Sequence, residues 1–133
     1  MTTDFVHRLR VRFGECDPQG VVFNANYLLY LDVAFTELWR ERLGGYAEMI
    51  ARGIDVMLVR SDLSYRRGAR ADDQIDVRLR VTALGTTSMT MEARVERDGE
   101  TLVEATLVHV FVHAASLEKA PIPADLRALL EPA

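Results

Sequence analysis

Asp17 is the acidic residue whose setting could support chemistry. It stands in the run GECDPQG, residues 14–20, where aspartate before proline, with Gly20 three residues on, predicts a type I turn. An Asp-Pro pair by itself is most often only a turn former. Here the turn leads into a long apolar segment, and the N-terminus of a buried helix has unpaired backbone N–H groups and a positive dipole end. Such N–H groups could hold a carbonyl oxygen while the carboxylate attacks it or activates water.

The histidines and the cysteine indicate no second reactive centre. His109 and His113 stand four residues apart in the alternating, β-branched segment LVHVFVH. On a strand they would share a face about 13 Å apart, too far to chelate one metal ion. We interpret them as satisfied or interface histidines. Cys16 has no histidine close in sequence, so we interpret it as a small buried apolar residue. No metal site is expected.

Length and composition exclude several classes of protein. The chain has 133 residues, of which 49% are hydrophobic and 27% charged, with a net charge of −4 and one cysteine. This length predicts a single domain, residues 1–133. The acidic balance argues against a sequence-independent nucleic-acid binder, and one cysteine excludes an intrachain disulfide framework. No apolar run approaches the ~18 residues of a membrane span, and residues 1–12 lack a signal-peptide core. We expect a soluble protein of the cytoplasm.

Periodicity predicts one long helix that positions the turn. Apolar residues recur at helical spacing over residues 26–43, with Asn24 and Asn26 as candidate N-caps and Gly44-Gly45 as the stop. The first two turns are apolar nearly all round, which predicts a helix enclosed by the rest of the fold. A shorter amphipathic helix is expected over residues 46–52.

Alternation with a period of two predicts the strands. They are expected at residues 5–13, 54–66, 75–83, 88–97 and 101–113. The Asp98-Gly99 pair predicts a hairpin turn, LGTTS at residues 84–88 a tight turn, and residues 123–130 a short final helix. The last strand is apolar on both faces from Leu107 onward. One helix cannot cover both faces of a sheet, so we expect an oligomer.

The segment FGECDPQGVVFNANYLLYLDVA, residues 13–34, resembles the signature of acyl-CoA thioesterases of the 4-hydroxybenzoyl-CoA thioesterase family. The matching positions are Phe13, Gly14, Glu15, Asp17, Gly20, Val21, Val22, Phe23, Asn26 and Tyr27. The predicted order of strand, long helix and four strands is also that family's order. The resemblance implies an α+β hotdog fold, in which a five-stranded antiparallel sheet wraps around one long central helix.

The resemblance also implies site residues. Asp17 would be the catalytic carboxylate, acting as nucleophile or general base. Backbone N–H groups at the helix start would polarise the thioester carbonyl, namely those near Asn24, Ala25, Asn26 and Tyr27. The acyl pocket would include Met57, Leu58 and Val59, with Asp32 meeting a polar acyl tail or bonding a neighbouring residue. The coenzyme would contact Arg66, Arg67, Arg70, Thr87, Ser88 and Lys119.

The implied function is hydrolysis of an acyl-CoA, or of an acyl carrier protein thioester, to a carboxylic acid and free thiol without a cofactor. A homotetramer of dimers is implied as well. Two alternatives stay open: a non-hydrolytic acyl-thioester binding protein and a hotdog dehydratase. Dehydration usually needs an Asp–His pair, and no histidine lies between residues 15 and 32. Asn24 replaces a histidine or aromatic residue found in several relatives, and an amide cannot act as a base near neutral pH.

Overall fold

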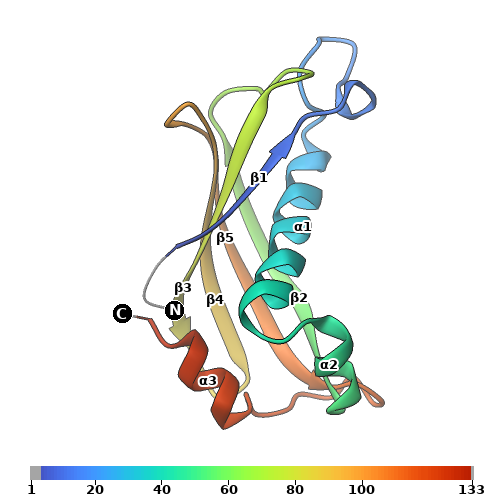
Figure 1. The fold of residues 1–133 in the computed structure, drawn as a ribbon, viewed down its shortest axis with the longest axis vertical. Coiled ribbons are helices and arrows are strands. Elements are labelled where there is room, and N and C mark those ends of the chain that lie inside the picture. The colour runs from blue at the N-terminus through green and yellow to red at the C-terminus, as the bar shows by residue number, and fades with distance from the viewer. Residues whose placement is uncertain (1–3, 133) are drawn as a thin grey trace.

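The alternating segments form one antiparallel sheet against which a long helix packs (Figure 1). The computed structural model describes residues 4–132. The strands are β1 (Phe5–Arg10), β2 (Ile54–Tyr65), β3 (Gln74–Leu84), β4 (Ser88–Arg97) and β5 (Glu100–His113). They lie in the order β1-β3-β4-β5-β2, and every neighbouring pair is antiparallel. The predicted fold class is confirmed.

Helix α1 (Ala25–Arg42) lies along one face of the sheet (Figure 1). Its buried residues are Tyr27, Tyr30, Leu31, Ala34, Phe35, Leu38 and Trp39, at the spacing that places them on one face. The helix ends at the predicted glycine pair, where Gly44 and Gly45 have φ of +87° and +93°. On the other side, Leu29 is 49% exposed and Val33 38% exposed. One copy of the chain therefore encloses the helix only in part.

The first strand is shorter than predicted. It ends at Arg10, and residues Phe13–Glu15 form a short 3-10 turn, η1. Beyond Arg10 the pairing becomes irregular: the Val11 N–H donates to the Asp73 carbonyl, but the Val11 carbonyl accepts from the N–H of Asp72, which has a φ of +72°. Phe13, expected on the buried face of a strand, is 87% exposed. Alternation alone could not show where this strand's pairing stopped.

The two short helices and the turn between β4 and β5 lie where the sequence predicted them. Helix α2 (Tyr46–Ala51) follows α1, and helix α3 (Ala124–Leu130) buries Leu126 and Leu130. Asp98 and Gly99 both have positive φ, as the tight turn between β4 and β5 requires. No helix within residues 4–132 is long and apolar enough to span a membrane.

The doubly apolar end of β5 has a partner within the same chain. Val112 forms a bridge with Lys119, and the Ala120 N–H donates to the Phe111 carbonyl. The C-terminal segment therefore pairs with the edge of this strand. Phe111 and Val112, which lie on opposite faces, are both buried within one copy of the chain, so the two apolar faces by themselves do not require an oligomer. The two edge strands among the described residues are β1 and β2, of which β2 is the longer.

Candidate active site

The loop before α1 folds back on itself and places Asp17 beside the helix start. The Gly20 N–H donates to the Asp17 carbonyl over 2.9 Å, which confirms the predicted turn. The Asp17 N–H donates to the Val21 carbonyl, and the Phe23 N–H donates to the Glu15 carbonyl. Residues 15–17 thus run antiparallel to residues 21–23. In this register Asp17 and Phe23 are diagonal neighbours, roughly 7–8 Å apart.

The Asp17 carboxylate is half-buried and has one oxygen free. Its Oδ1 accepts a hydrogen bond of 2.8 Å from the Gln19 N–H, which orients the side chain across its own turn. Within residues 4–132 no hydrogen bond or ion pair engages Oδ2. That oxygen can act as a nucleophile or a base.

Some backbone N–H groups at the start of α1 are hydrogen-bonded within the chain, and others are not. The Asn26 N–H donates to the Phe23 carbonyl over 2.8 Å, and the Tyr27 N–H donates to the Asn24 carbonyl over 3.3 Å. For the N–H groups of Asn24 and Ala25, the described part of the chain provides no acceptor. Of the four backbone N–H groups predicted to polarise the thioester carbonyl, only these two are therefore available. They lie at the positive end of the helix dipole.

Neither asparagine caps the helix with its side chain. Asn24 holds the N-cap position, but its amide makes no capping hydrogen bond. The Asn26 Nδ2 donates instead to the Glu15 carbonyl over 2.9 Å, which ties the loop to the first turn of the helix. Asn24 is therefore the N-cap by position, as predicted, but not by a side-chain hydrogen bond. Asn26 is not a cap and instead stabilises the loop that carries Asp17.

Glu15 is a structural anchor of the same loop. Its carboxylate accepts hydrogen bonds from the Arg12 guanidinium and from the Tyr30 hydroxyl, the latter over 2.9 Å. Desolvation by burial raises the pKa of Glu15, but the hydrogen bonds from Arg12 and Tyr30 outweigh it, so the pKa lies below its ordinary value. Burial and the neighbouring carboxylate raise the pKa of Tyr30. Tyr30 lies within the predicted helix of residues 26–43, but its spacing there does not reveal the hydrogen bond to Glu15.

The connection between β2 and β3 clamps the Asp17 loop from the other side. The Ala69 N–H donates to the Tyr27 hydroxyl over 2.9 Å, and the Val22 N–H donates to the Ala69 carbonyl over 2.8 Å. Gly68 fits here because a Cβ at this position would lie 2.9 Å from the Val21 side chain. These backbone contacts between distant segments had no signal in the sequence.

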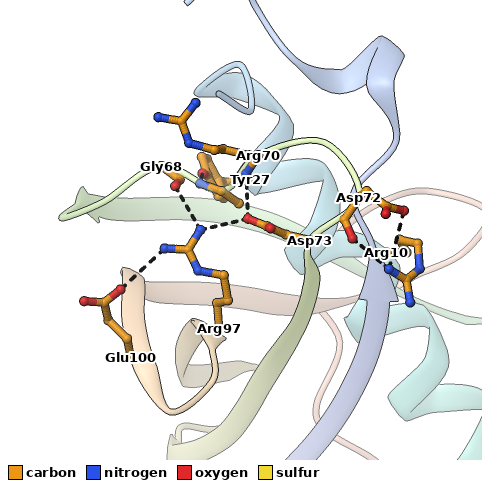
Figure 2. Close-up of polar contacts among 9 residues, drawn as sticks. Arg10, Tyr27, Gly68, Arg70, Asp72, Asp73, Arg97 and Glu100 are labelled. Atoms are coloured by element: carbon orange, nitrogen blue, oxygen red, sulfur yellow. Dashed lines mark hydrogen bonds and ion pairs between the residues drawn. The ribbon is translucent and has the colours of Figure 1, made fainter. Parts of the chain in front are cut away.

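Arg70 is the predicted coenzyme contact that lies next to Asp17's turn. A Cβ at Gly20 would lie 3.6 Å from the Arg70 Nη1, so the guanidinium lies against this turn. Asp73 and Arg97 hold the segment in place: Asp73 accepts from the Arg70 N–H and pairs with Arg97, each over 2.8 Å. Figure 2 shows the Arg70 side chain pointing away from this pair. Hydrogen bonds from Arg70 and Arg97 outweigh desolvation and hold the pKa of Asp73 below its ordinary value.

The remaining predicted coenzyme contacts are divided between the two ends of the sheet. Arg66 and Arg67 lie near Arg70 but form ion pairs with Glu104 and Glu100, over 2.8 and 3.0 Å. At the opposite end, the Thr87 carbonyl and Lys119 pair with the last residues of β5, and Ser88 begins β4. Ser88 lies level with Met57 of β2, because both pair with Val110, and the chain from Met57 to Arg66 spans roughly 30 Å. One copy of the chain cannot bring both groups to the same phosphate.

Two cavities run between α1 and the sheet. The smaller, about 250 Å³, begins at Ala25 and Leu28, and the larger, about 720 Å³, reaches Trp39 and Met49. The residues that line both are Asp32, Phe35, Leu58 and His109. They mark the junction of the two spaces.

The predicted acyl-pocket residues are only partly brought together. Asp32 and Leu58 line both cavities, whereas Met57 and Val59 line neither. Side chains alternate along β2, and Val59 is the extra residue at an irregularity between Leu58 and Arg60. Asp17 lines neither cavity. Its loop leads into Ala25, which lines the smaller cavity, so Asp17 lies near that end of the smaller cavity.

His109 is a residue of this junction that the sequence interpretation missed. Its side chain is buried, with 4% exposed, and Nδ1 has no hydrogen-bond partner among residues 4–132. The ring stacks on Phe35 with centroids 4.2 Å apart. Burial lowers its pKa to about 4, so the imidazole is neutral at pH 7. The interpretation as a satisfied histidine is therefore wrong for Nδ1, because the neighbours on this face of β5 are apolar. The interpretation as an interface histidine stays a prediction.

No group of histidine, cysteine and acidic side chains within residues 4–132 is arranged to hold a metal ion. The described residues provide a carboxylate oxygen in the loop before α1, two unpaired backbone N–H groups at the start of α1, and an elongated cavity space that begins at Ala25.

The chain is similar to known proteins over most of its length. The model of the thioesterase-like superfamily matches residues 11–130. The acyl-CoA thioester hydrolase YbgC of Escherichia coli is 26% identical over 126 residues, covering 94% of each chain. The 1,4-dihydroxy-2-naphthoyl-CoA hydrolase of Synechococcus elongatus is 23% identical, covering 96% of each chain. A crystal structure of a protein from Aquifex aeolicus superposes with a TM-score of 0.90 and 28% identity, covering 96% of this chain and 99% of that one.

Proposed function

The chain belongs to the thioesterase-like superfamily, and we propose that it hydrolyses acyl-CoA thioesters with Asp17 as the catalytic carboxylate. The observation that carries this proposal is the free Oδ2 of Asp17 in the loop that ends at the unpaired N–H groups of Asn24 and Ala25. The names of the hydrolases to which the chain is similar support the same substrate class.

The reaction follows from these donors and this acid. The thioester carbonyl oxygen accepts hydrogen bonds from the Asn24 and Ala25 N–H groups, which stabilise negative charge as it develops there. Asp17 Oδ2 attacks the carbonyl carbon, the C–S bond breaks, and the coenzyme leaves as thiolate and takes a proton from water. Water then hydrolyses the Asp17 anhydride. In the alternative route Asp17 takes a proton from a water molecule that attacks directly.

Arg70 supplies the cation for the coenzyme at this end of the sheet. It makes no ion pair among the described residues, whereas Arg66 and Arg67 are already paired with glutamates. A phosphate group gains most from a guanidinium that is not already neutralised. Thr87, Ser88 and Lys119 would contact the same coenzyme only if a second copy of the chain supplied them.

We further propose that the chain forms a homotetramer of dimers, and that β2 joins the two sheets of each dimer. This edge strand exposes the predicted pocket residues, with Met57 at 41%, Leu58 at 40% and Val59 at 58%. Leu29 and Val33 of α1 are exposed as well. A long apolar edge strand invites pairing with another chain, and a second copy would close the open side of the cavities.

Release of free thiol from acyl-CoA tests the catalytic assignment. The substrates are short, long, branched and aromatic acyl-CoAs. The substitution Asp17→Asn should suppress release by orders of magnitude on every substrate that the parent protein uses. Asp98→Asn is the matched control, because Asp98 lies in the distant hairpin turn with a positive φ that asparagine accepts.

Other outcomes would favour the alternatives. Tight binding of acyl-CoA without thiol release would favour a binding protein. Hydration of an enoyl-CoA without thiol release would favour a dehydratase.

A further inference from the structure

Tyr65 connects the end of β2 to the start of α1. Its hydroxyl donates to the Asn24 carbonyl over 3.4 Å, although the two residues are 41 residues apart in the sequence. Tyr65 is the last residue of β2, and the N–H of the next residue, Arg66, donates to the Leu102 carbonyl over 2.8 Å. The backbone that carries this tyrosine is therefore held by the sheet.

The ring of Tyr65 is held as well. It meets the Tyr27 ring edge to face, with centroids 5.8 Å apart and an interplanar angle of 61°. Tyr27 is 2% exposed, and its hydroxyl accepts from the Ala69 N–H. The Tyr65 side chain is 53% exposed. Its hydroxyl therefore has a fixed direction even though solvent reaches it.

The carbonyl that Tyr65 contacts belongs to the same peptide group as the unpaired Ala25 N–H. A trans peptide group is planar, so its carbonyl and its N–H point in opposite directions. A donor that fixes the Asn24 carbonyl on one side therefore fixes the direction of the Ala25 N–H on the other. The Tyr27 N–H also donates to this carbonyl, but over 3.3 Å, which is beyond the usual range for such a bond.

Hydrogen bonds in a row also polarise one another. With a thioester in place, the row would consist of the Tyr65 hydroxyl, the Asn24–Ala25 peptide group and the substrate carbonyl oxygen. The bonds strengthen as negative charge develops on that oxygen, so the effect of Tyr65 is largest in the transition state. The contribution of the same bond to folding is small, because water can replace it at the surface.

We propose that Tyr65 is a positioning residue for thioester hydrolysis, and that it acts through the Asn24–Ala25 peptide group by orienting and polarising the Ala25 N–H. The inference rests on the proposed function, because it takes this N–H as a donor to the thioester carbonyl. It assigns the role to a residue of β2, outside the loop and helix that carry the reacting groups.

The effects of Tyr65→Phe on kcat and KM test this role. The variant keeps the ring against Tyr27 and removes the hydroxyl. Loss of a whole donor to a developing oxyanion costs roughly 10²–10³ in kcat, so loss of its polarisation should lower kcat about tenfold. KM and the melting temperature should not change. The substrate is the acyl-CoA of the panel on which the parent protein is fastest.

Two comparisons separate this role from others. The fall in kcat should be equal on the N-acetylcysteamine thioester of the same acyl group, because only the carbonyl is involved. A fall on the acyl-CoA alone would assign Tyr65 to the coenzyme and overturn the proposal. Ser64→Ala is the matched control and should keep the parent kcat, because Ser64 is an exposed hydroxyl residue on the opposite face of β2.

Two further measurements report the polarisation itself. 3-Fluorotyrosine at position 65 is a stronger donor than tyrosine, so at pH 6.5, where the phenol keeps its proton, kcat should rise about twofold. A packing role alone predicts no such rise, and this protein keeps its ring and hydroxyl if Tyr65→Phe does not fold. The amide nitrogen resonance of Ala25 should move upfield in Tyr65→Phe, because its peptide carbonyl loses a donor, and should stay in place in Ser64→Ala.

The outcomes are distinct. An unchanged kcat or an unmoved Ala25 resonance in Tyr65→Phe, or no rise in kcat with 3-fluorotyrosine, overturns the role of Tyr65 and leaves the proposed function standing. Failure of the parent protein to release thiol from any thioester of the panel overturns both.

Discussion

Phe35 of α1 and His109 of β5 stack with ring centroids 4.2 Å apart and an interplanar angle of 7°. This contact joins the helix to the sheet at the point where the two cavities meet. It also places a polar ring where its own fold offers it no hydrogen bond. A residue that stability alone would select against at this position is a reasonable place to look for function.

His109→Phe should stabilise the free protein by about 1–2 kcal/mol, because it removes an unpaired buried polar group and keeps an aromatic ring. Urea denaturation at pH 7 measures the free energy of unfolding. A loss of stability of that size or larger would show that the imidazole has a structural role in the empty protein.

The same substitution should change the pH dependence of stability. The pKa of His109 falls from 6.5 to about 4 on folding, so the unfolded chain binds the extra proton first as pH falls. Because of this residue, the free energy of unfolding of the parent protein should therefore fall by on the order of 3 kcal/mol between about pH 6.5 and pH 4. His109→Phe should lack that loss, as shown by melting temperatures across this range. Identical profiles for the two proteins would contradict the buried, neutral imidazole.

Tyr30→Phe should destabilise the protein by about 1 kcal/mol, because the hydroxyl bonds the Glu15 carboxylate inside the Asp17 loop. Glu15 has its pKa lowered in the folded state, so it stabilises the protein above pH 4.5 and this contribution is lost as pH falls. The free energy of unfolding of the variant should therefore fall less than that of the parent protein as pH is lowered through this range. Tyr46→Phe is the control, because its bond to Asp55 is exposed. Equal effects of the two substitutions in urea denaturation would contradict the anchoring role of Glu15.

Arg70→Gln should raise KM for acyl-CoA about tenfold, because the guanidinium beside Gly20 would lose its phosphate partner. Thioesters of N-acetylcysteamine lack the phosphates, so their kcat/KM should not change. Arg80→Gln is the control, since Arg80 is exposed on β3. A similar loss on both kinds of thioester would show that Arg70 supports the loop rather than the coenzyme.

Val59→Lys should dissociate the oligomer and abolish thiol release, because it places a charge on the exposed edge strand. Leu129→Lys introduces the same charge at an exposed residue of α3 and should leave the assembly intact. Light scattering after gel filtration gives the mass. A parent protein that is active as a monomer would contradict the proposal that a second copy completes the site.

The sequence predicted the elements well because strong periodic signals specify them. The glycine pair after α1 and the Asp98-Gly99 turn both have the positive φ values that these signals require. The end of β1 could not be predicted, because it depends on backbone hydrogen bonds between Val11 and residues 72–73. Alternation continues past the point where the pairing stops.

The site was predictable where one contiguous motif carries it, and not elsewhere. The turn of Asp17 and the helix start lie within residues 13–34, so the resemblance covered them. Arg97, Asp73 and His109 reach the site through strand pairing over long sequence separations. Their burial and partners depend on the assembled sheet, which local spacing does not encode.

The rate of thiol release by Asp17→Asn, measured at saturating acyl-CoA beside Asp98→Asn, tests the central claim most directly. We expect kcat to fall at least a thousandfold in the first variant, with unchanged acyl-CoA binding and melting temperature, and to stay at the parent value in the second. A folded Asp17→Asn protein that retains more than a tenth of the parent kcat would contradict the assignment.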